Sequence, residues 1–307
     1  MKNKLAYLYQ IKVINIVEVN EKIYKIITPE SNFILKKVDS LNKENIYIRL
    51  QMTKLNFFSL PIKSINDRYV EEINHEYYIL SYYFKDENLS LNEVRMSFYL
   101  KALGHLHLNS SYPLKVNDGY FIESLNYIEN KIIKVREEIE LRMYNIEHQE
   151  YHSPSSWYFI SCYQIFNNAL NESQKYLDLL NEEFEKLNSV ELTLTYQNFS
   201  LDHIIIKEEK IISLEKMNIA PPVYDLVDFI EKNYNEKIDI SVLLNNYFGI
   251  YQYNLYQKYW LLSLLYIPKV TKQISDFNDI EDIYLSVNYL KLVEKIKSSL
   301  LKQTEEE

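Results

Sequence analysis

The segment LTYQNFSLDHIIIKEEKIISLEK, residues 194–216, decides the fold class of this chain. An apolar strand pattern is followed by a short polar loop, and then by two apolar runs, 203–206 and 210–215, that have the spacing of a β-hairpin. Asn198 lies in the loop and Glu215 lies at the end of the hairpin. The segment therefore predicts a small β structure that brings together polar side chains from two places in the sequence.

The chain around this segment has two patterns of hydrophobic periodicity. Residues 1 to about 40 alternate apolar and polar positions, which predicts three short strands. Residues 43–55 have helical spacing, and strand-like runs near 69–72 and at 76–84 predict two further strands. Most of the remaining chain has helical spacing. Helices are predicted after a capping box at Ser90 and Glu93, and over 122–147, 156–187, 224–233, 240–262 and 281–302.

These patterns predict an α+β fold. Residues 1–85 are expected to form a β-rich N-terminal lobe. Residues 86–307 are expected to form a larger, mostly helical C-terminal lobe that contains the loop and hairpin. A chain of 307 residues with 47% hydrophobic residues is long and apolar enough to build such cores.

Composition excludes several classes of function. The chain has only 3 glycines, about 1% where about 7% is usual, so a glycine-rich phosphate loop is not expected. The net charge of −9 argues against general binding to nucleic acid or to an anionic membrane, since both need a basic face. No run of about 20 apolar residues predicts membrane insertion.

Cysteine content and the N-terminus predict a cytoplasmic protein. Cys162 is the single cysteine, which excludes an internal disulfide framework and a cysteine-based zinc cluster. The N-terminal segment lacks the long apolar run and small-residue cleavage site of a signal peptide.

Motifs in fixed order along almost the whole chain resemble those of the aminoglycoside phosphotransferase and choline kinase-like superfamily. Within it, the chain is most similar to spore coat proteins of the CotS type. The motifs that carry the resemblance are FILKK at 33–37, EYYILSYYF at 76–84, ALGHLHLNS at 102–110, VYDLVDFI at 223–230 and LLYIPK at 264–269. The resemblance implies a protein kinase-like fold with two lobes, with ATP and Mg²⁺ as cofactors.

The catalytic loop departs from the pattern of active relatives. Their loop has the form H-G-D-x-x-x-x-[NH], and here the same stretch begins at Tyr196 and ends at His203. The aspartate that accepts the substrate proton is matched by Asn198. An amide cannot take up a proton near neutral pH, so a contribution of about 10²–10⁴ in rate is lost. Asp202 is four residues further on and is expected to face elsewhere.

The resemblance also implies roles for residues around the loop. Lys36 matches the nucleotide-binding lysine, and Lys37 is its competitor on the opposite face of the strand. Glu44, early in the next helix, is the candidate for the carboxylate that pairs with this lysine. His203 and Glu215 match the metal-binding positions, and Glu215 replaces an aspartate with a longer side chain that still carries oxygen ligands for Mg²⁺.

Three functional hypotheses follow. The leading one is a pseudokinase that acts through contacts with other proteins, such as spore coat components, in the cytoplasm or in the coat of a bacterial spore. The second is an active ATP-dependent kinase that phosphorylates an alcohol group of a small molecule. The third is a switch that binds nucleotide without turnover. Loss of the base at Asn198 favours the first hypothesis.

Overall fold

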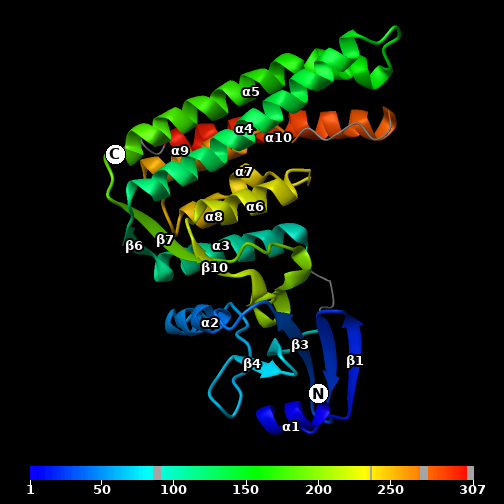
Figure 1. The fold of residues 1–307 in the computed structure, drawn as a ribbon, viewed down its shortest axis with the longest axis vertical. Helices are drawn as coiled ribbons and strands as arrows, with labels where there is room; N and C mark the ends of the chain where they lie inside the picture. Colours follow the sequence, from blue (N-terminus) through cyan, green and yellow to red (C-terminus); the bar gives the residue numbers. More distant parts are fainter. Residues whose placement is uncertain (86–90, 236, 270–275, 303–307) are drawn as a thin grey trace. The chain divides into compact units, whose positions relative to one another are not determined.

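The computed structural model describes residues 1–85, 91–235, 237–269 and 276–302. The chain forms two compact units, and each is made of two stretches of sequence (Figure 1). The first unit contains Met1–Tyr112 and Leu192–Ala220, and the second contains Pro113–Glu191 and Pro221–Glu307. In the part of the chain that the structure describes, no helix has the length and hydropathy needed to span a bilayer.

An antiparallel sheet of five strands is the main β structure of the first unit. Its spatial order is β1-β2-β3-β5-β4, and every neighbouring pair is antiparallel. The strands are β1 (Asn15–Asn20), β2 (Ile23–Ile27), β3 (Asn32–Val38), β4 (Val70–Ile73) and β5 (Glu76–Tyr82). All five strands predicted for the N-terminal region are therefore confirmed.

The N-terminal helix α1 (Lys2–Tyr9) was missed by the sequence patterns. It buries Leu5 and Leu8 in the same apolar cluster as Phe33 and Leu35 of β3. The helix has only eight residues, which is too few for helical periodicity to stand out, and packing against the sheet stabilises it.

Two further helices belong to the first unit. The predicted helix after β3 is confirmed as α2 (Lys43–Met52), and α3 (Asn92–Ser110) follows later in the chain. Ser90, the predicted start of the capping box, lies outside the described residues, and α3 begins after Leu91 without a side-chain cap.

Residues 194–216, the predicted strand, loop and hairpin, also lie in the first unit. Its strand β7 (Ser189–Thr195) pairs antiparallel with β10 (Asn218–Ala220), so that Leu194 faces Ile219. Between them lie the short hairpin strands β8 (Ile204–Ile205) and β9 (Lys210–Ile211), together with three 3₁₀ turns, Leu201–His203, Ile206–Glu208 and Leu214–Lys216. The predicted strand, loop and hairpin are confirmed.

Helix α3 and the loop after β7 share aromatic contacts with the segment after α2. Phe57 lies against Phe98 and His105 of α3, and Phe58 lies against Tyr196 at the start of the loop. These contacts explain why the first compact unit continues past residue 85. The division into lobes at that residue stays a prediction.

The second unit is mostly helical. It contains the short strand β6 (Tyr112–Lys115), most of which belongs to this unit, and two long helices, α4 (Asp118–Glu147) and α5 (Pro154–Phe184), which run side by side (Figure 1). Helix α5 also packs against two helices later in the sequence. The later helices are α6 (Val223–Asn233), α7 (Ile240–Leu243), α8 (Asn245–Phe248), α9 (Leu255–Leu265) and α10 (Asp276–Lys302).

The single helix predicted over 240–262 was wrong, because the chain forms α7, α8 and α9 there. Asn254 starts α9 with a capping box, in which its side chain accepts from the N–H of Gln257 and the Gln257 side chain accepts from the N–H of Asn254. Such a box satisfies orphan donors at a new helix start. The interruption therefore has a local cause that the apolar pattern alone did not reveal.

Candidate functional site

The loop after β7 is held in place by buried side chains of the first unit. Tyr99 of α3 lies against both Tyr196 and Phe199, and all three rings are buried. Arg95 of α3 is also buried and donates a hydrogen bond to the carbonyl oxygen of Leu201, at 3.1 Å. Buried aromatic rings and Arg95 therefore hold the loop in place. The motif comparison did not identify Arg95 as a residue that supports the loop.

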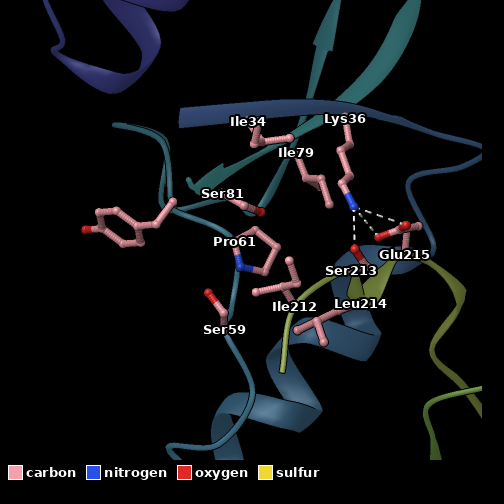
Figure 2. Close-up of a pocket in the computed structure, with 11 residues that line it drawn as sticks. Ile34, Lys36, Ser59, Pro61, Ile79, Ser81, Ile212, Ser213, Leu214 and Glu215 are labelled. Atoms are coloured by element: carbon pink, nitrogen blue, oxygen red, sulfur yellow. Dashed lines mark hydrogen bonds and ion pairs between the residues drawn. The ribbon is translucent and has the colours of Figure 1, made fainter. Parts of the chain in front are cut away.

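Lys36 and Glu215 form an ion pair in the first unit (Figure 2). The Lys36 ammonium is 3.2 Å from each oxygen of the Glu215 carboxylate and donates to the hydroxyl oxygen of Ser213 at 2.8 Å. The two side chains are 15% and 28% exposed, so the pair is shielded from water without being fully desolvated. The structure thus brings together two of the predicted site residues.

The predicted partner of Lys36, Glu44, lies elsewhere. Its carboxylate accepts hydrogen bonds from the backbone N–H groups of Tyr69 and Val70, at 2.9 and 2.8 Å. Those groups stand at the entry to β4, where Glu44 satisfies donors that the sheet does not use. The pairing predicted for Glu44 is therefore corrected, since the carboxylate beside Lys36 is Glu215.

Lys37, the competing lysine, points to the other face of β3. It forms an ion pair with Glu76, the first residue of β5. Side chains alternate between the faces of a strand, so only one of the two lysines can approach the hairpin. Lys36 is the lysine of this pair that contacts the hairpin segment, through Ser213 and Glu215.

Asn198 connects the loop to the hairpin through its side chain. Its amide nitrogen donates to the carbonyl oxygen of Ser213 at 2.8 Å, and the residue is only 7% exposed. The carbonyl oxygen of Ser213 therefore accepts a hydrogen bond from the Asn198 amide, and the hydroxyl oxygen of Ser213 accepts one from the Lys36 ammonium. Ser213 was not among the predicted site residues, because nothing in its sequence position distinguishes it from other polar residues of a hairpin.

His203 lies beside the same loop. Its Nδ1 atom is 2.9 Å from the carbonyl oxygen of Asn198 and 3.1 Å from the hydroxyl oxygen of Tyr196, which itself donates to the carbonyl oxygen of Ile212. A carbonyl oxygen only accepts, so Nδ1 carries the proton and Nε2 keeps its lone pair in the neutral ring. Burial is the largest cause that lowers the pKa of His203 below 6.5. The positive charge of Lys36 acts in the same direction.

Acidification is expected to weaken the fold through His203. Because the pKa is lower in the folded chain, the unfolded chain binds a proton first as the pH falls below 6.5, and the free energy of unfolding decreases. Above that pH the contribution is complete. Urea midpoints between pH 5 and 8 should show a smaller slope for His203→Asn than for the natural protein. An equal slope in both proteins would assign the pH dependence to other groups.

Two residues of the site adopt left-handed backbone conformations. Gln197 has φ 47° and Ser213 has φ 63°. Gln197 occupies the place of the glycine in the H-G-D pattern, and a positive φ is a conformation that glycine adopts at least cost. The loop has thus kept a glycine conformation with a side chain present, at a cost of about 1–2 kcal/mol.

The pocket beside Lys36 is very small. It has a cavity volume of about 40 Å³ and is lined mostly by residues of β3, β5, segment 59–61 and the hairpin (Figure 2). Its apolar lining includes Ile34, Ile79 and Leu214. Pockets that bury a small-molecule ligand usually have about 300–1,000 Å³, so this cavity is well below the usual range.

The site also lacks a ready set of metal ligands. Within the described residues, no group of three His, Cys, Asp or Glu side chains is placed to hold a metal ion. Glu215, one of the two predicted ligands, already neutralises Lys36. Binding Mg²⁺ there would require the carboxylate to leave the ammonium, so the roles of Glu215 and His203 in metal binding stay predictions.

Comparison with solved structures supports the fold assignment. The chain matches an aminoglycoside phosphotransferase from Alicyclobacillus acidocaldarius with a TM-score of 0.72 and 9% identity, over 100% of this chain and 97% of that one. It matches spectinomycin phosphotransferase, solved with ADP and spectinomycin, with a TM-score of 0.58 and 12% identity, over 96% and 97% of the two chains. The AMP-bound complex of that enzyme gives 0.56 and 13%, over 95% of this chain and 96% of that one.

Sequence comparison adds no assignment. No protein-family model matches the chain, and no curated protein matches it. Likeness at 9–13% identity establishes the protein kinase-like fold of these phosphotransferases, with a small antiparallel sheet and a mostly helical C-terminal part. The predicted fold class is confirmed.

Proposed function

We propose that this protein is a pseudokinase, a kinase-fold protein that has lost phosphoryl transfer and acts through contacts with other proteins. The hydrogen bond from the Asn198 amide to the Ser213 carbonyl oxygen carries the proposal. A catalytic aspartate at this position must accept a proton from substrate. Here the side chain donates instead, and an ionised carboxylate could not make the same bond. The hydrogen bond of Asn198 supports a structural role for this residue, and an amide cannot take up a proton near neutral pH.

The state of Lys36 supports the same proposal. In an active kinase the corresponding lysine is available to nucleotide phosphates. Here Glu215 forms an ion pair with the Lys36 ammonium, and the Ser213 hydroxyl accepts a hydrogen bond from it. The adjoining pocket has a volume of about 40 Å³. ATP would have to displace Glu215 from the ammonium and open the apolar lining before it could bind. Nucleotide binding would therefore compete with the Lys36–Glu215 ion pair.

The resemblance to CotS-type proteins suggests where such contacts are made. We extend the proposal to assembly of the coat of a bacterial spore, with other coat proteins as partners.

Thermal unfolding with and without Mg-ATP tests the proposal. A pseudokinase whose pocket stays closed is expected to melt at the same temperature with and without millimolar Mg-ATP. A ligand that binds only the folded state at 100 times its Kd stabilises by about 2.7 kcal/mol, which would raise the melting temperature by several degrees. Such a rise would contradict the closed pocket. Lys36→Met, which removes the ammonium, is the matched control for any shift.

An active small-molecule kinase is the second candidate. Its support is the fold match to spectinomycin phosphotransferase together with the clustering of Lys36, Glu215 and His203 near the loop. It requires a base other than Asn198. Phosphate transfer from ATP to any member of a panel of aminoglycosides, choline and sugars would establish it. A melting shift without product would instead support the nucleotide-binding switch.

A further inference from the structure

A second pocket of the first unit lies at the C-terminal ends of α2 and α3. Its cavity volume is about 190 Å³. Leu194 of β7 and Ile219 of β10, which face each other in the strand ladder, form part of its apolar lining. The described lining residues are Arg49, Met52, Thr53, Asn109, Ser110, Tyr112, Leu194 and Ile219. None of these residues lines the pocket beside Lys36.

The charge of this pocket is unbalanced. Arg49 contributes a guanidinium group, and no carboxylate occurs among the described lining residues. Two other pockets that contain a lysine also contain an acidic residue, Glu215 beside Lys36 and Glu231 beside Lys269. The described lining of this pocket therefore carries a positive charge with no carboxylate among the described lining residues.

The orientation of Arg49 is set by an aromatic ring. Its guanidinium carbon lies 5.3 Å from the centre of the Tyr112 ring. A cation–π contact of this kind favours one placement of the guanidinium, so less freedom is lost when a ligand binds. Arg49 donates no side-chain hydrogen bond to another described residue, whereas its neighbours in the pocket have partners.

Those neighbours are satisfied within the protein. The Ser110 hydroxyl donates to the carbonyl oxygen of Leu106 and accepts from the N–H of Leu194. The Thr53 hydroxyl donates to the carbonyl oxygen of Leu50. Arg49 is consequently the charged donor among the described lining residues, and Leu194 and Ile219 form an apolar part of the same lining, here called the apolar floor.

We propose that this pocket binds a carboxylate carried on a small apolar body. The planar fork of a guanidinium matches the two oxygens of a carboxylate, and the apolar floor matches a ring or a short branched chain. The cavity is smaller than that of a typical drug site, which limits the ligand to about the size of benzoate. A free organic acid and the C-terminus of a polypeptide both present this chemistry.

Calorimetric titration of the full-length protein with benzoate tests the proposal. Benzoate is expected to bind, and benzamide, which has the same shape without the charge, is expected to bind at least about tenfold more weakly. Arg49→Met should cause a similar loss of benzoate affinity. Arg68→Met, which removes another exposed arginine of the same unit that does not line the pocket, should leave the affinity unchanged.

A second variant separates the pocket from the charge. Asn109 is exposed at the pocket, so Asn109→Phe should keep the fold, which circular dichroism would check, and fill the apolar space. It should weaken benzoate binding while Arg49 is still present. Equal affinities for benzoate and benzamide, an unchanged affinity in Arg49→Met, or no heat with millimolar benzoate would each overturn the proposal.

The source of the carboxylate is resolved by a peptide arm. The probe is acetyl-Ala-Ala-Phe with a free C-terminus, and its C-terminal amide is the control. Tighter binding of the free acid than of benzoate would support a polypeptide end as the ligand. Binding of benzoate without the peptide would support a free organic acid.

Discussion

Asp279→Ala is expected to lower the free energy of unfolding by about 3–5 kcal/mol, the range for breaking a buried ion pair. Asp279 of α10 has a fully buried side chain, and its Oδ2 atom lies 2.5 Å from a guanidinium nitrogen of Arg142 of α4. Arg142 is itself 12% exposed and lies over the ring of Phe159, at 4.2 Å. Removing the carboxylate would take a buried ion-pair partner away from this shielded guanidinium in the second unit.

The expected loss includes the cost of breaking the buried pair and is not the net value of the pair. Asp279→Leu combined with Arg142→Met should therefore recover most of the stability, because neither charge is then buried. Urea denaturation of the natural protein, both single variants and the double variant gives the coupling energy directly. A single variant within 1 kcal/mol of the natural protein would show that water reaches this pair, as it reaches surface ion pairs. Lys232→Ala, which removes an exposed partner of Asp228, is the surface control.

The order of elements was predictable wherever periodicity is strong and local. The first 40 residues, which contain β1 and β3, largely alternate apolar and polar positions, and the long helices α4 and α5 keep an apolar stripe over many turns. Helix α1 was not predictable, since Leu5 and Leu8 acquire their helical environment from a sheet formed by later residues. The start of α9 is fixed by the hydrogen bonds between Asn254 and Gln257, which the spacing of apolar residues does not show.

The motif resemblance nominated Asn198, His203, Glu215 and Lys36, and their functional roles stay predictions. The structure brings Lys36 and Glu215 into contact, and that connection was not predicted. Which carboxylate meets Lys36 depends on a contact across 179 residues of sequence, and the nearer Glu44 was the wrong choice. Ser213 contacts Asn198 of the loop through its carbonyl oxygen and Lys36 of β3 through its hydroxyl oxygen. These contacts arise from tertiary structure, which the spacing of residues in the sequence does not show.

Asn198→Asp is expected to destabilise the protein by about 2–3 kcal/mol near neutral pH, although it introduces the aspartate of the H-G-D pattern. The Asn198 amide donates to the Ser213 carbonyl oxygen at 2.8 Å, in a position that is 7% exposed. An ionised aspartate would place an acceptor against that oxygen and leave both groups without a donor. The expected result is a lower urea midpoint and no phosphate transfer to the substrate panel. Asn198→Ala removes the donor without adding charge, so it should lower the urea midpoint by less than Asn198→Asp does.

The effect of Asn198→Asp should depend on pH in a direction that identifies its cause. A protonated carboxyl can donate to the Ser213 carbonyl oxygen, so the folded chain should hold this proton above the usual aspartate pKa of about 3.9. The folded state then binds more protons than the unfolded state as the pH rises past that value, and the variant loses stability relative to the natural protein. The difference in urea midpoint should therefore be small near pH 4 and grow toward pH 7, whereas Asn198→Ala should show a constant difference. A variant with natural stability and new transferase activity at pH 7 would mean that Asn198 is a reversible loss of the base, and that the donor to Ser213 is dispensable.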